Sequence, residues 1–344
     1  MTNAYQTTIA WLAAVVFETT FNPTANAHHS DSPFDKSKFL SFDATVVEFE
    51  WKNPHVFVQV ETLDDDGNVV KLQLEGDGIP ILIPHSWSRD SLKVGDKIRV
   101  EANPPRIAAR RSLLGRTITM EDGTVLDLNP MSNRSITPSN LGVASGLTGT
   151  WLPRWESFRG LTAGRDSRSY TDEGLRVTAA YNNLTDSPQA HCVPFSAPRI
   201  MVYAVHADIE DLTDRVLINI DWMSVERMVY TDGRDHPKDG ERTLQGHTIG
   251  RWEDNALVMD TTLFSEDSMA GLGGLPSGPS KRIEERMSLS DDRKTLNYQF
   301  VLEDPKYLIE PITGSGVWDY RPDLKSSGTE CDLESAQRYL ESVK

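Results

Sequence analysis

The stretch VFVQVETLDDDGNVVKLQL, residues 56–74, decides the fold class. Hydrophobic side chains alternate with polar ones on both sides of the acidic run at residues 64–68. A period of two residues is the pattern of a strand with one buried face, and an Asp- and Gly-rich run between two such segments indicates a tight turn. The stretch therefore predicts a β-hairpin.

The same alternation recurs on both sides of the hairpin, over residues 28–128. It is seen at residues 44–49, in KIRVE at 97–101, and at 117–120 and 125–128. Five or six short strands at this spacing favour a small OB-like β-barrel. A short helix is expected near residues 84–92.

A second, larger β domain is expected at residues 147–331, after a Ser-, Asn-, Pro- and Gly-rich linker at 129–146 and before a C-terminal tail at 332–344. Successive strands with short turns predict an antiparallel, lipocalin-like β-barrel, with an open sandwich as the alternative. The fold class is thus all-β. The expected strands of this domain are residues 199–206, 215–222, 226–231, 248–252, 256–262, 281–289, 295–303 and 316–320.

The N-terminus indicates export. Residues 8–17, TIAWLAAVVF, are apolar but too short to span a bilayer, and Ala25-Asn26-Ala27 has the small-x-small pattern of a cleavage site. We expect a signal peptide at residues 1–27 and a periplasmic or secreted protein that does not insert into the membrane after cleavage. The n-region has no Lys or Arg, so an N-terminal tail is the alternative.

The net charge indicates which binding partners to expect, and the two cysteines indicate whether a disulfide is to be expected. The formal net charge of -16 repels phosphate backbones, so nucleic acid is not an expected partner. The two cysteines, Cys192 and Cys331, are able to pair in an oxidising compartment, with two buried free thiols as the alternative. We therefore expect a disulfide-stabilised protein that binds a small molecule.

Two stretches resemble known families. HHS at 28–30, FD at 34–35 and WKNPH at 51–55 resemble the DUF6152 family of exported bacterial proteins, over residues 28–128. The second stretch is similar to a family of exported bacterial β proteins with a DGRxHP…GHSxGRWEGD…LVVDT pattern. It departs from that pattern at Thr248, where Ser is usual, and at residues 254–255, where Asp-Asn replaces Gly-Asp. Neither resemblance implies a reaction. The second pattern is carried by YTDGRDHP at 230–237, GHTIGRWE at 246–253, LVMDTT at 257–262, ER at 285–286 and DP at 304–305.

One candidate site is a copper site at the N-terminus. Cleavage after Ala27 leaves the α-amine and Nδ1 of His28 together, and a second imidazole from His29 or His55 completes a set of nitrogen ligands. Nitrogen ligands in a planar arrangement suit Cu(II). The arrangement resembles the histidine brace of some secreted copper proteins. The alternative is a solvated N-terminus, with His55 as an ordinary strand residue.

The other candidate site is a cluster of polar side chains in the second domain. His236, Asp232 and Tyr230 are expected to handle protons, because a His beside a carboxylate and a Tyr is common equipment for proton transfer. Arg234 and His247 are expected to hold the developing negative charge. The alternative is an ordinary Asp-Gly-Arg turn. The complete candidate set is Tyr230, Asp232, Arg234, His236, His247 and Glu285.

These observations give one leading function and two alternatives. The chain has no Walker A loop, no dinucleotide Gly pattern after a strand, no GxSxG elbow and no HExxH. We expect an exported small-molecule-binding barrel that performs cofactor-free lyase or isomerase chemistry on a hydrophobic or aromatic compound. Trp222 and Trp252 are expected to line the barrel interior around the site. The alternatives are a periplasmic copper-binding protein and a non-catalytic binding module.

Overall fold

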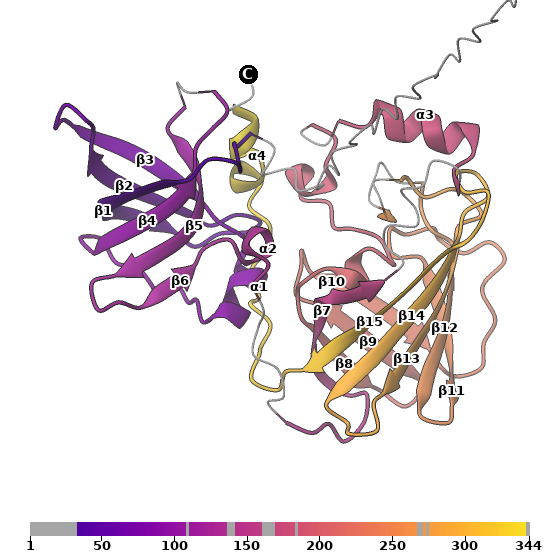
Figure 1. Ribbon diagram of the computed structural model, residues 1–344. Helices are drawn as coiled ribbons and strands as arrows, with labels where there is room; N and C mark the ends of the chain where they lie inside the picture. The colour runs from indigo at the N-terminus through magenta and orange to yellow at the C-terminus, as the bar shows by residue number, and fades with distance from the viewer. Residues whose placement is uncertain are drawn as a thin grey trace, which may run out of the picture.

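Two β-barrels lie side by side in the computed structural model (Figure 1). The all-β prediction is therefore confirmed. The structure describes residues 33–107, 110–135, 142–159, 169–182, 185–266, 271–272 and 275–341. The expected signal peptide, together with His28 and His29, lies outside the described residues.

The first barrel has five strands that close on themselves. The strand order is β3-β2-β1-β4-β5, and β3 pairs with β5 in parallel to complete the ring. This closure by a parallel pair gives the OB-like barrel that the sequence predicts. The strands of this domain are β1 (Leu40–Glu50), β2 (Phe57–Leu63), β3 (Val69–Glu75), β4 (Lys97–Asn103), β5 (Ser112–Met120) and β6 (Val125–Asp127), which extends the sheet beside β5.

The short helix of this domain begins earlier than expected. It consists of α1 (Ile79–Leu82) and the 3-10 turn η1 (Ile83–His85), between β3 and β4. Pro80 and Pro84 occupy the first turns of these two segments, where a missing backbone N–H costs no hydrogen bond. The expected helix at residues 84–92 is therefore wrong: the helical residues end at His85, and residues 86–92 form turns and a loop.

The second barrel has nine strands in near-sequential order around the ring, β7-β8-β9-β10-β11-β12-β13-β14-β15, and β15 closes onto β7. Adjacent strands are antiparallel except β10 and β11, whose two parallel residue pairs follow the long connection at residues 231–246. The strands are β7 (Gly149–Arg159), β8 (Ala207–Asp211), β9 (Arg215–Ile220), β10 (Val225–Tyr230), β11 (His247–Glu253), β12 (Ala256–Thr262), β13 (Arg282–Leu289), β14 (Thr295–Glu303) and β15 (Ile312–Tyr320).

Two strands of this barrel were not predicted from the sequence, and one predicted strand does not form. The expected strand at residues 199–206 is instead the 3-10 turn η5 (Ile200–Val202) and a loop, whose apolar side chains enter the core from the barrel end. The unpredicted strand β7 contains Pro153, and the unpredicted β8 carries Asp208 and Glu210. Proline and acidic residues are depleted in strands, so both segments lacked the usual signal.

The interior of the second barrel is packed with side chains. Trp151, Tyr298 and Trp318 are almost completely buried and belong to one continuous hydrophobic core. In a nine-stranded barrel filled in this way, side chains occupy the interior space in which a ligand would otherwise bind. The expectation that Trp222 and Trp252 line an internal site is wrong: Trp222 is buried in the turn after β9, and Trp252 is 43% exposed on β11.

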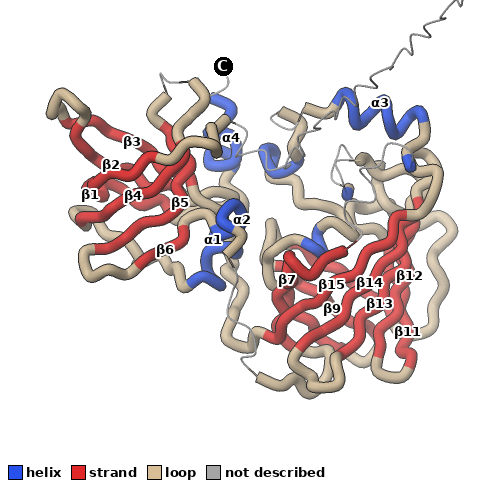
Figure 2. Tube along the Cα trace, viewed as in Figure 1, coloured by secondary structure: helices blue, strands red, loops and turns tan. Residues whose placement is uncertain are grey.

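The remaining helices are short and peripheral to the barrels (Figure 2). Within the described residues, no helix has the length and apolar character needed to cross a membrane. These elements are α2 (Pro130–Asn133), α3 (Asp172–Ala180), the 3-10 turn η4 (Pro188–His191) and the terminal helix α4 (Leu333–Glu341).

The C-terminal segment ties the second domain back to the first. After β15 the chain returns to the first barrel, and α4 lies beside it (Figure 1). Ser335 donates its hydroxyl to the backbone carbonyl of His55 at 2.9 Å. Cys192 and Cys331 form a disulfide, so the expected pairing is confirmed. The segment is thus fastened at both ends to structured parts of the molecule.

Asn53 of the WKNPH stretch is the centre of this junction. Its side-chain oxygen accepts the backbone N–H of Ile79 at 2.8 Å, at the start of α1. Its side-chain amide donates to the carbonyl of Thr329, and its own carbonyl accepts the N–H of Asp332. One buried asparagine therefore joins the loop after β1, helix α1 and the C-terminal segment.

Candidate functional site

The structure divides the six predicted catalytic residues between the two faces of the barrel wall. Five lie on or above the outer face, at the ends of β10 and β11 and in the connection between them. Glu285 lies inside the barrel. We call the outer group the outer-wall cluster; it comprises Tyr230, Asp232, Arg234, His236 and His247, together with Asp260 and Arg282.

Tyr230 and His247 form the base of the outer-wall cluster. They occupy the last residue of β10 and the first of β11, and their rings stack with centroids 5.2 Å apart. Strand β10 ends at Tyr230, so Arg234 does not continue along its face as the alternation suggested. The turn at Gly233, where φ is +81°, instead folds Arg234 back over the Tyr230 ring, 4.0 Å from its centroid.

His236 reaches the cluster from the connection between β10 and β11. Its Nδ1 lies 2.9 Å from the Nδ1 of His247. A hydrogen bond between two imidazole nitrogens requires one N–H and one lone pair, so the contact holds a single proton between the two rings.

Asp260 and Arg282 complete the cluster and were missed from the sequence. The Nε2 of His236 lies 3.7 Å from the Asp260 carboxylate, which Arg282 binds through two hydrogen bonds of 2.9 Å. The signal lay in the strand register: Ile249 pairs with Asp260, so Asp260 points to the same face as His247, two residues earlier on β11. Without knowledge of this pairing the sequence offers no reason to select Asp260.

Electrostatics separate the roles of the clustered side chains. The hydrogen bond from Arg234 lowers the pKa of Asp232 to about 2, so this carboxylate stays ionised at neutral pH. A group so far from neutrality is poorly suited to exchange protons. Burial lowers the pKa of His247, and the neighbouring His236 and Arg234 lower it further. His247 is therefore a neutral imidazole at neutral pH, which is the form that accepts a proton.

Glu285 belongs to a different constellation inside the barrel. Alternation along β13 places Glu284 outside, opposite Asp260, and Glu285 inside, opposite Met259. There the Glu285 carboxylate accepts hydrogen bonds from Arg227 at 2.9 Å and from the Tyr298 hydroxyl at 2.7 Å. The side chains of Arg227 and Glu285 are fully buried, so Glu285 is a partner in an internal ion pair and not a member of the surface cluster.

His55 is the one predicted metal ligand that the structure describes. It is only 7% exposed, and its Nδ1 lies 3.4 Å from the Gly76 carbonyl and 3.7 Å from the Glu75 carboxylate. Across the described residues, no group of three or more His, Cys, Asp or Glu side chains is arranged to hold a metal ion. The copper hypothesis stays a prediction, since it depends on His28 and His29.

Comparison with known families concerns the first domain. Residues 18–114 match the model of DUF6152, described as a family of unknown function. No curated protein matches the chain. The matched residues contain both motifs that suggested the resemblance, HHS and WKNPH. The first domain of this chain is therefore similar to the DUF6152 family of proteins of unknown function.

Proposed function

We propose that the protein is exported and transfers protons on a small molecule at the outer-wall cluster. The observation that carries this proposal is the 2.9 Å contact between the Nδ1 atoms of His236 and His247. The contact joins the neutral imidazole of His247 to the imidazole of His236, whose Nε2 faces the Asp260 carboxylate. The base His247, the second proton acceptor His236 and the Asp260 carboxylate are thus arranged in series.

The roles follow from the order of the groups. His247 accepts a proton from an acidic C–H or O–H of the substrate, because its lowered pKa keeps it neutral. The proton is shared with His236, and Asp260 stabilises the positive charge that forms on that ring. Arg234, stacked on Tyr230, is placed to attract the negative charge left on the substrate. Return of the proton to another atom gives an isomerase, and its delivery to a leaving group gives a lyase.

The groups in this scheme differ from the sequence-based expectation in two ways. Asp260 replaces Asp232 as the carboxylate of the relay, because Asp232 is held by Arg234. The site is on the outer wall, where Arg234 and Asp232 are exposed and Tyr230 and His236 are half-buried. An open site of this kind suits a substrate that is itself small and presents one polar edge. No cofactor enters the scheme.

Export rests on the predicted signal peptide and on the disulfide. Disulfides persist in oxidising compartments and are rare in reducing ones. The Cys192–Cys331 bridge is in keeping with a periplasmic or secreted protein.

Deuterium wash-in tests the proton-transfer proposal without knowledge of the product. Small aromatic ketones and hydroxy acids are incubated with the protein in D₂O, and exchange at the acidic position is followed by NMR. His247→Gln and His236→Gln are expected to lower the exchange rate by roughly 10²–10⁴-fold. His191→Gln is the matched control, since the His191 ring contacts the Thr185 carbonyl outside the cluster. Equal exchange rates in all four proteins would exclude the relay.

A further inference from the structure

A cavity of about 360 Å³ lies between the two domains. We propose that this interdomain cavity is a second binding site, which takes a neutral or singly cationic aromatic molecule. Its walls are α1, η1 and α2 on the first domain and β7 and β15 on the second. On the barrel ring, β11 is separated from β15 by β12, β13 and β14, and from β7 by β10, β9 and β8. The interdomain cavity is therefore on the opposite wall from the outer-wall cluster.

The apolar part of the lining is suited to an aromatic body. Trp155, Leu152 and Pro153 of β7 face Met131 of α2 and Pro84 of η1 across the cavity. Ligand cavities in proteins usually measure about 300–1,000 Å³, are mostly apolar, and are often found at domain interfaces. The cavity meets the conditions of volume and location, about half of its lining is apolar, and its volume suits a compact single- or double-ring compound.

A fixed ion pair provides one polar side of the cavity. Arg154 donates its Nε to the Asp319 carboxylate at 3.0 Å, and a second hydrogen bond joins its guanidinium to the other oxygen. Asp319 is only 4% exposed, while the Arg154 side chain is 34% exposed. A two-pronged pair of this kind has a defined geometry and offers oriented donors and acceptors without rearrangement.

The charges of the lining decide the class of ligand. Arg154 supplies one positive charge, and Asp319 and Glu156 supply two negative charges. Burial lowers the pKa of His85, against the raising effect of Asp127, so its imidazole is neutral at neutral pH. The lining residues that the structure describes thus have a net charge of −1 within a chain of net charge -16. Anionic ligands are repelled, and a neutral or cationic polar group is favoured.

The cavity is held open by rigid connections between the domains. The backbone at Gly78 approaches the second domain so closely that a Cβ there would lie 3.2 Å from the Trp222 ring and 2.7 Å from the Pro54 carbonyl. Ile81 of α1 belongs to the hydrophobic core of the second domain. The Cys192–Cys331 disulfide adds a covalent link. A preformed cavity binds without the free-energy cost of bringing two domains together.

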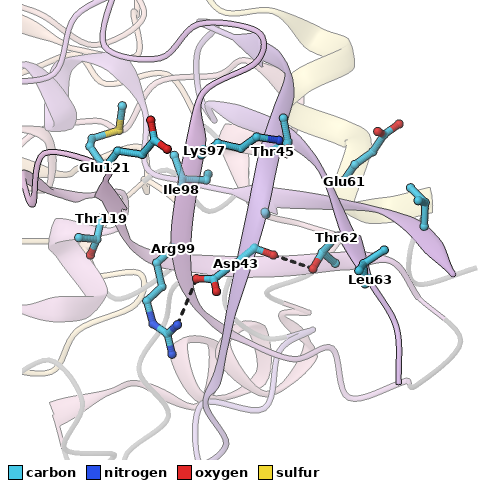
Figure 3. A pocket seen from close by; sticks show the side chains of 13 residues that line it. Asp43, Thr45, Glu61, Thr62, Leu63, Lys97, Ile98, Arg99, Thr119 and Glu121 are labelled. Atoms are coloured by element: carbon cyan, nitrogen blue, oxygen red, sulfur yellow. Dashed lines mark hydrogen bonds and ion pairs between the residues drawn. The ribbon is translucent and has the colours of Figure 1, made fainter. Parts of the chain in front are cut away.

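A larger hollow on the first barrel is more open to solvent than the interdomain cavity (Figure 3). It has a volume of about 510 Å³ and lies over β1, β2, β4 and β5. Its two basic side chains have partners within the hollow: Arg99 pairs with Asp43 at 3.1 Å, and Lys97 donates to the Thr45 hydroxyl at 2.6 Å. Arg99 and Asp43 are 57% and 81% exposed, so solvent screens their charges. The interdomain cavity is the better enclosed and the more selective of the two.

Three probes with one aromatic body and different charges test the proposal: 2-phenylethylamine, 2-phenylethanol and 3-phenylpropionate. Their binding to the full-length mature protein is measured by ligand-observed NMR and by quenching of tryptophan fluorescence. The amine and the alcohol are expected to bind at least tenfold more tightly than the carboxylate. Equal binding of all three, or preference for the carboxylate, would overturn the assignment.

Variants of the cavity lining test whether the probes bind in the interdomain cavity, and they distinguish this binding from proton transfer at the outer-wall cluster. Ala204→Trp, which fills the cavity with an indole, is expected to abolish probe binding, and Glu156→Gln is expected to lower the affinity for the amine but not for the alcohol. Trp252→Phe, an exposed residue of β11 outside the cavity lining, is the control and leaves binding unchanged. If Ala204→Trp does not fold, Trp155→Leu takes its place. Unchanged amine affinity in Glu156→Gln and in the cavity-filling variant would overturn the proposal, whatever the outcome for His236 and His247.

Discussion

At the scale of single residues, the internal ion pair is the most costly feature of the second barrel. Arg227 and Glu285 are fully buried; the Tyr298 hydroxyl donates a further hydrogen bond to Glu285, and the Thr261 hydroxyl accepts one from Arg227. Removing two charges from water costs several kcal/mol for each ion, and only close, well-satisfied partners offset this. Burial and the nearby Glu285 raise the pKa of Tyr298 well above its usual value, so that it remains a donor.

Glu285→Gln should therefore destabilise the protein strongly. It leaves the Arg227 guanidinium buried without a counter-charge, and the free energy of unfolding is expected to fall by about 3–5 kcal/mol in urea titrations. Glu253→Gln is the control, because Glu253 pairs with Arg251 and Arg286 at the surface, where an ion pair contributes about 1 kcal/mol or less. A loss in Glu285→Gln no larger than in Glu253→Gln would contradict the structural role of this pair.

His206 introduces a pH dependence of stability. Its side chain is fully buried, 3.7 Å from Asp221, and neither ring nitrogen forms a hydrogen bond within the described part of the chain. Burial lowers the pKa of His206, although Asp221 and Asp208 act in the opposite direction. The unfolded chain takes up a proton near pH 6.5, whereas the folded chain resists it until the pH is lower.

The free energy of unfolding should consequently fall as the pH decreases below about 6.5, because the unfolded state then binds more protons than the folded state. His206→Leu removes this contribution. Urea titrations at pH 7.5 and pH 5.5 are expected to show a smaller difference between the two pH values in the variant than in the parent protein. An identical difference in both proteins would show that His206 does not carry the effect.

At the scale of elements, Arg338 is one of the side chains that hold helix α4 against the first barrel. Its guanidinium binds the Glu50 carboxylate at 2.7 and 2.8 Å and lies 4.0 Å from the centre of the Phe57 ring. This pairing lowers the pKa of Glu50. The contact gives the otherwise short helix its tertiary support, because an isolated helix of this length is unstable in water.

Arg338→Ala should release α4 while leaving both barrels folded. Hydrogen exchange of the backbone amides in residues 333–341 is expected to become much faster, with little change in the strands of either barrel. Arg251→Ala, at the exposed surface of β11, is the control. Equal protection of α4 in both variants would mean that the helix is held by contacts other than those of Arg338.

The alternation of apolar and polar residues was sufficient to predict most strands but not their partners. The hairpins of β11 with β12 and of β13 with β14 follow from local turns, whereas the closure of β15 onto β7 depends on contacts far apart in the sequence. The same limit applies to the site. Tyr230 and His247 were identified, but the pairing that brings Asp260 to them was not. Glu285 was included in the candidate set without knowledge of its face, and the pairing of β12 with β13 places it inside the barrel, where a shift of one residue would have moved it to the outer face.

At the scale of the whole molecule, the disulfide determines how firmly the domains are joined. Cys192 and Cys331 are separated by 139 residues, and their Cα atoms lie 5.7 Å apart. Closing so long a loop lowers the entropy of the unfolded chain, which stabilises the folded protein by roughly 4–5 kcal/mol on the chain-entropy model. Sequence permitted the pairing but did not establish it, because proximity depends on the return of the C-terminal segment to the first domain.

Replacing both cysteines by alanine should lower the thermal midpoint, and addition of a reductant should lower the midpoint of the parent protein but not that of the variant. Calorimetry with and without dithiothreitol measures both effects. A variant that melts at the same temperature as the oxidised parent would contradict a stabilising role for the bridge.

The central claim is that His236 and His247 share one proton. Nitrogen-15 NMR of the imidazole side chains over a pH titration measures this directly, without a substrate. We predict that His247 titrates below pH 6.5 and that His236→Gln moves its midpoint upward, because His236 lowers the pKa of His247. A His247 midpoint near pH 6.5 that His236→Gln leaves unchanged would contradict the relay and the function proposed from it.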